Sequence, residues 1–286
     1  MFNKIMTGAL VILGLSLGNA SASETINFFV GHGNGGLSSA FQTKVATGLK
    51  DKGWNINFKI IGNCGKVKAD LDSSNEPMIA GWGADWNADS KNVCYNPPSA
   101  DAFVDVFVIS PRLLCGPLGD ANFKLEKGKK YVVGVNEGQN HQVLLNDLGA
   151  KLGITFKVVE YRNSGFIKRA MQAKEIDAWY TTKGLVEHQS GQQKCLYGTL
   201  TTPLDGITPL NTVLNTDNVY SSFVGYLITN NKFSADTRKK LVADINDIIK
   251  SAEYRSALKS TGSYVTDDNS EAQVDYVKAT AKAFAK

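Results

Sequence analysis

Apolar and polar positions change their period repeatedly along the chain, which predicts strands that alternate with helices. Residues 25–30 form a short β-branched and aromatic run that is typical of a strand. Phe41, Val45 and Leu49 then recur every four residues, which predicts a helix from about Ser38 with one apolar face. This succession is repeated downstream and is typical of an α/β protein with a mainly parallel sheet covered by helices.

Two breaks in this pattern indicate where the chain passes between domains. We expect strands at 25–30, 55–61, 78–81, 102–109, 131–135, 156–161, 176–181, 194–199 and 221–229, and helices at 38–49, 66–72, 142–152, 166–173, 183–189, 235–251 and from 270. The stretch 111–130 is rich in glycine, proline and lysine, and 202–220 is polar and irregular. Both stretches predict crossovers, and two helices are expected to close the chain.

The turn at 31–36 is the most informative stretch, because four of its six residues are glycine. Glycine lets the backbone turn sharply and lets a ligand come close to N–H groups. The helix that follows directs its free N–H groups and the positive end of its dipole at the same place. Ligands of parallel sheets bind beyond the carboxyl ends of the strands. The turn therefore predicts an anion site, together with the loops at 62–65, 136–141 and 162–165.

The N-terminus has the pattern of a secretory signal peptide. Lys4 precedes an apolar run at 6–17, and the small residues at 20–22 form a cleavage site, so cleavage is expected after Ala22. The run is shorter than the ~20 residues that span a membrane, so an anchor is not expected. No cysteine follows the cleavage site, which argues against a lipoprotein. We expect an exported, periplasmic protein.

Composition narrows the class further. The chain has 286 residues, of which 43% are hydrophobic and 20% charged, enough for one large or two ordinary domains. The net charge of +4 is small for a chain of this length and does not indicate nucleic-acid binding. No H-E-x-x-H motif or histidine and aspartate cluster at ligand spacing occurs, so no metal or cofactor is expected.

The four cysteines predict disulfides rather than a zinc or redox site. They stand apart, with no C-x-x-C pair, and export favours oxidation. Four cysteines allow three connectivities, and isolated buried thiols are the alternative. We expect Cys64–Cys94 and Cys115–Cys195, because this pairing respects the expected division of the chain.

Several motifs in consistent order carry a resemblance to a known family. They are Gly35-Gly36-Leu37-Ser38-Ser39, Gly62-Asn63-Cys64-Gly65, Gly138-Gln139-Asn140-His141, the loop at 158–165, Glu175-Ile176-Asp177-Ala178, the turn at 190–196 and the closing segments at 253–258, 262 and 270–276. In these motifs the chain resembles the solute receptors of tripartite tricarboxylate transporters, the TctC/Bug family of periplasmic binding proteins. The resemblance covers nearly all of the mature chain.

The resemblance implies a two-lobed, type II-like periplasmic-binding-protein fold with two crossovers and a ligand cleft between the lobes. The chain would then divide into a signal peptide (1–22), a first lobe (23–122), a second lobe (123–215) and a return to the first lobe (216–286).

The resemblance also implies a small carboxylate ligand held by backbone amides, hydroxyls and ordered waters. The matching positions are Gly35, Gly36, Ser38, Ser39 and Asn63 in the first lobe and Gly138, Asn140, His141, Ser164 and Thr181 in the second. Arg162 is a candidate for a second carboxylate, with an exposed, solvated arginine as the alternative. Ser39 stands where the family has an aspartate that pairs with ligand amines, which weighs against an amino acid ligand.

The expected function is therefore a monomeric periplasmic solute-binding protein, not an enzyme, that captures a small organic anion and delivers it to membrane permease subunits. One alternative is an extracytoplasmic sensor for a signalling receptor, which would use the same closure of two lobes. A secreted hydrolase is another, since Ser38, Ser39 and three histidines are available, but no Gly-x-Ser-x-Gly elbow occurs. The glycines at 31–36 also match a dinucleotide fingerprint, but the second strand ends in Gly62-Asn63 instead of the acidic residue that would hold the ribose.

Overall fold

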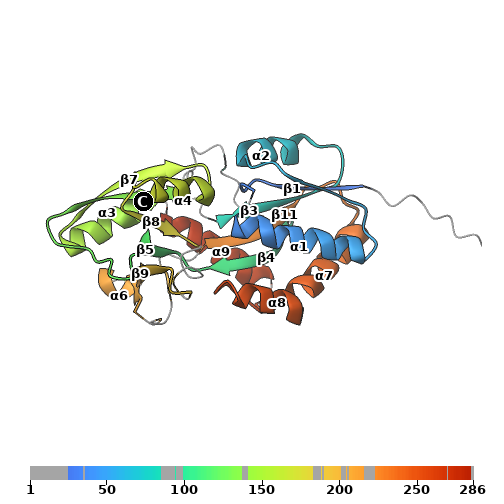
Figure 1. Cartoon of the computed structure of the whole chain (residues 1–286). Coiled ribbons are helices and arrows are strands. Elements are labelled where there is room, and N and C mark those ends of the chain that lie inside the picture. The colour runs from blue at the N-terminus through green and yellow to red at the C-terminus, as the bar shows by residue number, and fades with distance from the viewer. Residues whose placement is uncertain are drawn as a thin grey trace, which may run out of the picture.

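The molecule consists of two lobes, each built on its own sheet, which lie side by side (Figure 1). In the computed structural model the described residues are 25–34, 36–84, 94, 99–136, 141–182, 188, 190–200, 204, 206–215, 223–268 and 270–284. In these ranges the strand and helix alternation predicted from the sequence is confirmed. The predicted signal peptide at 1–22 lies outside them, as does most of the helix expected at 183–189.

The first lobe has a five-stranded sheet in the order β2-β1-β3-β11-β4. Its strands are β1 (Ile26–Val30), β2 (Ile56–Ile60), β3 (Met78–Gly83), β4 (Phe103–Ser110) and β11 (Phe223–Thr229). Strand β1 runs parallel to β2 and β3, whereas β11 is antiparallel to both β3 and β4. Strands β3, β4 and β11 are buried along their whole length, because helices cover both faces of this sheet.

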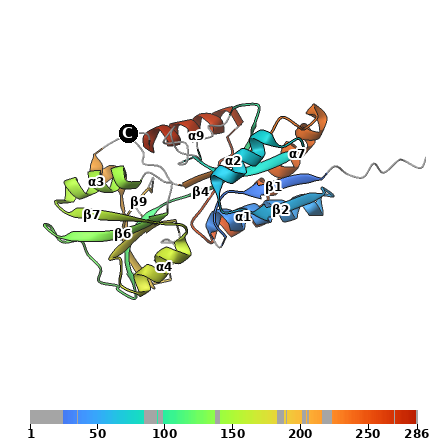
Figure 2. The same cartoon turned by 90° about the horizontal axis from the view of Figure 1, so that it is seen from above.

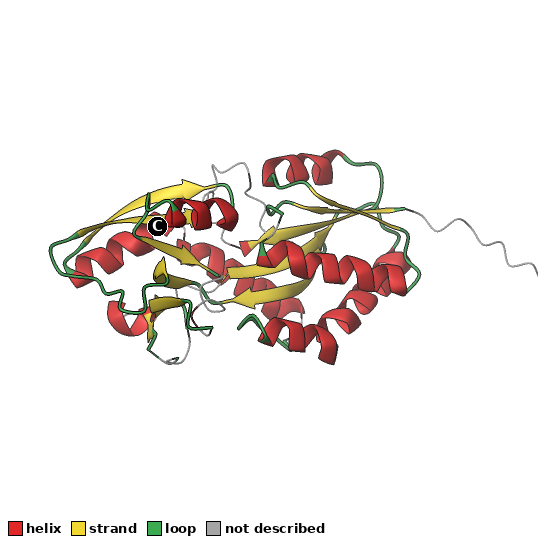
Figure 3. Cartoon of the chain, in the orientation of Figure 1, coloured by secondary structure: helices red, strands yellow, loops and turns green. Residues whose placement is uncertain are grey.

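Two helical layers enclose the first sheet, as Figure 3 shows. One layer holds α1 (Leu37–Asp51), α7 (Ala235–Lys250) and α8 (Ala252–Lys259), whose apolar faces share a core with β1 and β4. The other holds α2 (Cys64–Ser73) and α9 (Ser270–Phe284). Helix α9 packs on β4 and also contacts the second lobe at α3 (Figure 2).

The second lobe has a six-stranded sheet in the order β10-β9-β5-β8-β6-β7. Its strands are β5 (Leu113–Leu118), β6 (Lys130–Asn136), β7 (Thr155–Tyr161), β8 (Ala178–Thr181), β9 (Gln193–Gly198) and β10 (Thr208–Pro209). Helices α3 (His141–Leu152) and α6 (Leu210–Leu214) share one core of this lobe, and α4 (Ser164–Gln172) packs into the other.

The first crossover is shorter and lies earlier than the sequence indicated. Strand β4 of the first sheet leads into β5 of the second through Pro111 and Arg112 alone. The chain thus enters the second sheet before residue 122, the end of the first lobe that the resemblance implied. The residues Gly116 and Pro117 gave β5 the composition of a linker, but β5 pairs with β8 and β9.

The C-terminal part returns to the first sheet, but with three helices among the described residues rather than the two expected. Ser251 explains the extra helix: it ends α7, and its Oγ accepts a hydrogen bond from Tyr254 N at 3.2 Å to cap α8. In the described part of the chain, no helix has the length and apolar character needed to cross a bilayer.

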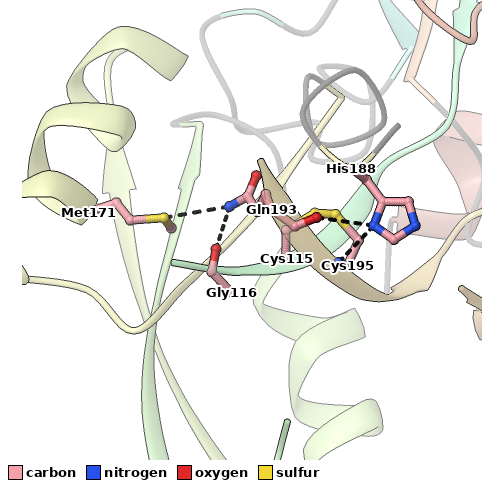
Figure 4. The surroundings of a disulfide bond; sticks show 6 residues. All are labelled: Cys115, Gly116, Met171, His188, Gln193 and Cys195. Carbon is pink, nitrogen blue, oxygen red and sulfur yellow. Dashed lines mark hydrogen bonds between the residues drawn. A yellow bond between two sulfur atoms is a disulfide. The ribbon is translucent and has the colours of Figure 1, made fainter. Parts of the chain in front are cut away.

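Both expected disulfides, Cys64–Cys94 and Cys115–Cys195, are present. The second joins β5 to β9 where the two cysteines are paired in register (Figure 4). Cys94 also accepts a hydrogen bond through its carbonyl from Trp82 Nε1 at 3.1 Å. Trp82 is fully buried and belongs to the core of the first lobe.

Candidate functional site

A polar cluster in the first lobe surrounds His32, two residues beyond the end of β1. Ser38 and Gln42 are one helical turn apart on α1, so their side chains lie on the same face. Ser38 Oγ is 3.0 Å from His32 Nδ1, and Gln42 Nε2 donates to Ser38 Oγ at 2.9 Å. Ser38 and Gln42 are buried and His32 is half-buried, so the three side chains form one largely buried network.

Gly81 of β3 makes room for this network. A Cβ atom at this position would lie 1.5 Å from Gln42 Oε1. The amide of Gln42 therefore lies directly against the sheet, and it does so only because residue 81 has no side chain. Oε1 of Gln42 is buried and has no hydrogen-bond partner among the described residues.

A buried arginine lies in the crossover between the lobes. Arg112 is 2% exposed, and its guanidinium carbon is 5.6 Å from the centre of the Phe223 ring, which it faces. The same ring meets His32 edge-on, with centroids 5.3 Å apart. The Arg112 backbone is fixed by Thr199, which accepts from Arg112 N at 2.8 Å and donates its own N–H to Arg112 O at 2.9 Å.

His141 brings the second lobe to the same arginine. It begins α3 after β6, is 1% exposed, and its Nδ1 is 3.5 Å from Arg112 Nη1. Its ring meets Tyr180 of β8 nearly at right angles, with centroids 5.1 Å apart. Arg112 therefore lies against His141 of the second lobe, and the ring of Phe223 connects it to His32 of the first lobe.

Both histidines are held neutral. Burial, followed by the positive charge of Arg112, lowers the pKa of His32 to about 3. The same two causes, in the same order, lower the pKa of His141 well below its ordinary value. At neutral pH the positive charge of this trio is thus that of Arg112, and the imidazoles act as neutral hydrogen-bonding groups.

Of the predicted first-lobe residues, only Ser38 joins the cluster through its side chain. Ser39 Oγ donates to Gly36 O at 2.9 Å, so its proton already serves the start of α1. Gly36 is the N-cap of α1 in an extended conformation. Asn63 is exposed and caps α2 by accepting from Lys66 N at 2.9 Å. Gly35 lies outside the described residues, as do Gly138 and Asn140 of the second lobe.

The other predicted second-lobe residues follow the ends of β7 and β8. Ser164 is buried at the start of α4, Thr181 is buried at the end of β8, and Arg162 is exposed. The loop of Arg162 faces the first lobe: a Cβ atom at Gly33 would lie 3.3 Å from Asn163 Cβ and 3.9 Å from Arg162 O. The turn after β1 and the loop after β7 thus come close to each other across the junction.

Sequence reasoning missed Arg112 and Gln42 as parts of the site. Arg112 was hidden in a stretch whose composition is typical of a linker, and Gln42 was counted with the helix that carries it. His32 drew attention only as a possible hydrolase residue. A charged residue two positions after a long apolar strand was the one signal that could have pointed to Arg112.

Comparison with solved structures identifies the class of the fold. A structure described as a periplasmic transporter matches with a TM-score of 0.73 and 15% identity, covering 93% of this chain and 96% of its own. The periplasmic binding protein BugD matches with a TM-score of 0.73 and 14% identity, over 91% and 95%. MatC from Rhodopseudomonas palustris, solved with bound malate, matches with a TM-score of 0.71 and 14% identity, over 92% and 99%.

These matches show that the chain has the two-lobed fold of periplasmic solute-binding proteins of the TctC/Bug type, as the sequence motifs predicted. No protein-family model matches the chain, and no curated protein is similar to it in sequence. At 13–15% identity the similarity concerns the fold, so the chemistry of the site has to be argued from this chain's own residues.

Proposed function

We propose that this protein is a periplasmic solute-binding protein that captures a small carboxylate and delivers it to a membrane permease. The observation that carries the proposal is the buried guanidinium of Arg112 at the lobe junction, which lies against His141 of the second lobe and shares the ring of Phe223 with His32 of the first. A guanidinium and imidazole N–H groups are suitable partners for a carboxylate. Because they belong to both lobes and the crossover, a ligand held by all three would favour a closed arrangement.

The fold neighbours support a carboxylate over other anions. MatC was solved with malate and another neighbour, Rpa4515 of R. palustris, with adipate. Rpa4515 matches with a TM-score of 0.72 over 91% of this chain. The signal-peptide pattern at 1–22 and the two disulfides are consistent with export.

The geometry does not favour a hydrolase. Ser38 and His32 are 3.0 Å apart, as a nucleophile and its base would be. However, a histidine whose pKa is lowered to about 3 is a poor proton acceptor at neutral pH. We therefore assign this pair to binding rather than to catalysis.

Thermal unfolding of the mature protein with a panel of mono-, di- and tricarboxylates, amino acids, sugars and phosphate tests the proposal. A ligand specific to the folded state adds ~2.7 kcal/mol at about 100 times its dissociation constant. We expect a shift of the midpoint with one carboxylate class, loss of that shift in Arg112→Gln, and its retention in the control Arg169→Gln on the exposed face of α4. No shift with any panel member, or an unchanged shift in Arg112→Gln, would contradict the proposal.

A further inference from the structure

We propose that the contact between α9 and α3 opposes closure of the two lobes, so that its packing sets how tightly the protein binds its ligand. This inference rests on the proposed function, because it concerns the closing motion that ligand capture requires. It follows from the anchoring of α9 to the first lobe, from its contact with the second lobe, and from its position relative to the crossover.

Helix α9 is fixed to the first lobe through its N-terminal half. Gln273 is buried, and its Oε1 accepts from Val106 N of β4 at 3.2 Å while its Nε2 donates to Asp268 O at 3.1 Å. Val274 and Val277 belong to the same apolar core as residues of β3, β4 and β11. This half of the helix should therefore move with the first sheet when the lobes change their relative position.

The C-terminal half of α9 reaches the second lobe. The helix contacts α3, and Figure 2 shows its C-terminal end beside that helix. Thr280 and Ala281 are buried in this half, whereas Ala279 is exposed. The two buried positions continue the helical spacing of the anchored residues, so one buried face runs along α9. The helix thus belongs to the first lobe by its packing and also bears on the second lobe.

The α9–α3 contact and the approach of Gly33 to Asn163 lie on opposite sides of the molecule. Asn163 directly precedes α4 as its N-cap, and a Cβ atom at Gly33 would lie 3.3 Å from Asn163 Cβ. Figure 2 shows α9 along one side and α4 along the other, with β4 between them. Strand β4 leads into the crossover at Pro111 and Arg112. A rotation of the lobes about this crossover that tightens one contact would therefore loosen the other.

This arrangement couples the packing of α9 on α3 to ligand affinity. Closure on the side of Gly33 requires α9 to draw away from α3, so good packing of these two helices stabilises the open form. The measured affinity of a protein is reduced when only a fraction of its molecules can bind. A side chain too large for the α9–α3 contact should therefore favour the closed form and strengthen binding, although it does not touch the ligand.

The first experiment uses the ligand-free mature protein and enlarges the buried residue Ala281. Small-angle scattering compares Ala281→Leu and Ala281→Phe with the same changes at the exposed control position Ala279. We expect the radius of gyration to fall with side-chain size at position 281 and to stay unchanged at position 279. Circular dichroism verifies that the helices are intact. An unchanged or larger radius of gyration in folded Ala281→Phe overturns the proposal.

A second experiment does not depend on the folding of the Ala281 variants. Gly33→Val places a branched side chain at the opposite contact, so it should press α9 onto α3. We expect the amide hydrogens in the C-terminal half of α9 to exchange about 5-fold more slowly than in the wild type. Gly36→Ala, where the nearest atom to the new Cβ is Gly33 O at 3.5 Å, should leave the exchange unchanged. Equal exchange in Gly33→Val and the wild type overturns the coupling of the two contacts.

The third experiment measures affinity by calorimetric titration with adipate and malate. We expect binding to be about 5-fold tighter in Ala281→Phe than in the wild type, and unchanged in Ala279→Phe. Equal or weaker binding in Ala281→Phe would overturn the link between this contact and affinity while leaving the proposed function standing. If no carboxylate binds the wild type, the proposed function fails, and the two ligand-free experiments still decide whether α9 opposes closure.

Discussion

At the scale of single residues, the site depends on groups that are buried and polar at once. His141 and Arg112 are buried and lie against each other, and the half-buried His32 lies against Ser38. Burying a polar group is costly unless it is hydrogen-bonded, so such a cluster is a strong sign of function or of strict structural need. The enclosure of these groups could not be recognised from the sequence, because they lie in a turn, in a crossover and at the start of a helix.

The low pKa of His32 predicts acid sensitivity. The pKa of His32 is about 3 in the folded protein, which is below its value in the unfolded chain. The contribution of the neutral His32 ring to the free energy of unfolding is therefore fully present above about pH 6.5 and is lost as the pH falls toward 3. Over this interval the free energy of unfolding should fall by about 1.4 kcal/mol per pH unit for this residue. Urea unfolding from pH 7 to 4 of the wild type and His32→Gln measures it. Parallel profiles of the two proteins would refute the prediction.

A second residue-scale prediction concerns the glycine beneath Gln42. In Gly81→Ala the new Cβ would lie 1.5 Å from Gln42 Oε1, so the amide has to move away from Ser38. We expect a loss of about 1–3 kcal/mol in unfolding free energy, typical of overpacking, and weaker ligand binding. In Gly36→Ala, the matched control, the nearest atom is Gly33 O at 3.5 Å, so stability should change little. Equal stability of both variants would contradict this account.

At the scale of elements, the hydrophobic pattern predicted most strands and helices because burial of apolar faces drives their formation. It failed where composition was misleading: β5 contains Gly116 and Pro117, yet pairs on both sides. It could not show that α8 is a separate helix, since the break at Ser251 is a matter of capping rather than hydropathy. The sequence predicted which loops would border the candidate site. It could not predict which side chains would meet there, because that depends on how the two lobes pack together.

Strand β4 carries a buried carboxyl group that should reduce stability at neutral pH. Burial raises the pKa of Asp105, although hydrogen bonds from Gln273 and Val106 N oppose this, and Oδ2 has no partner among the described residues. Because the pKa of Asp105 is raised in the folded protein, the contribution of this group to stability is present at low pH. That contribution is lost as the pH rises through the folded-state pKa. Asp105→Asn should therefore be more stable than the wild type at pH 7, by about 1 kcal/mol.

Differential scanning calorimetry at pH 3 and pH 7 measures this effect. The gain from Asp105→Asn should shrink at pH 3, where the wild-type carboxyl group is also neutral. Asp51→Asn, at the exposed end of α1, serves as the control and should have little effect at either pH. A loss of stability in Asp105→Asn at pH 7 would show that the ionised carboxylate is a net stabiliser of β4.

At the scale of the whole molecule, function requires that the two lobes approach each other closely around the crossover. The turn after β1 and the loop after β7 supply this approach at Gly33 and Asn163. The crossover at Pro111 and Arg112 passes from one sheet to the other and carries the buried charge. A ligand bound at Arg112 thus lies where relative motion of the lobes would change its contacts, which is how binding would shift the conformational equilibrium.

Side chains of increasing size at Gly33 should hold the lobes apart. A Cβ atom there would lie 3.3 Å from Asn163 Cβ, which is tight but tolerable, whereas a branched side chain is too large. We expect a small loss of ligand affinity in Gly33→Ala and a large one in Gly33→Val. Small-angle scattering should show that ligand compacts the wild type but not Gly33→Val. Equal compaction of both proteins would remove this contact from the closing motion.

The central claim is that a carboxylate is bound at the lobe junction by Arg112 with His32 and His141. A crystal structure of the mature protein with the carboxylate that most raises its unfolding temperature tests this most directly. The account predicts ligand oxygens within hydrogen-bonding distance of the Arg112 guanidinium and of both imidazole rings. A carboxylate bound elsewhere, or bound with Arg112 and both imidazoles turned away from it, would contradict the account.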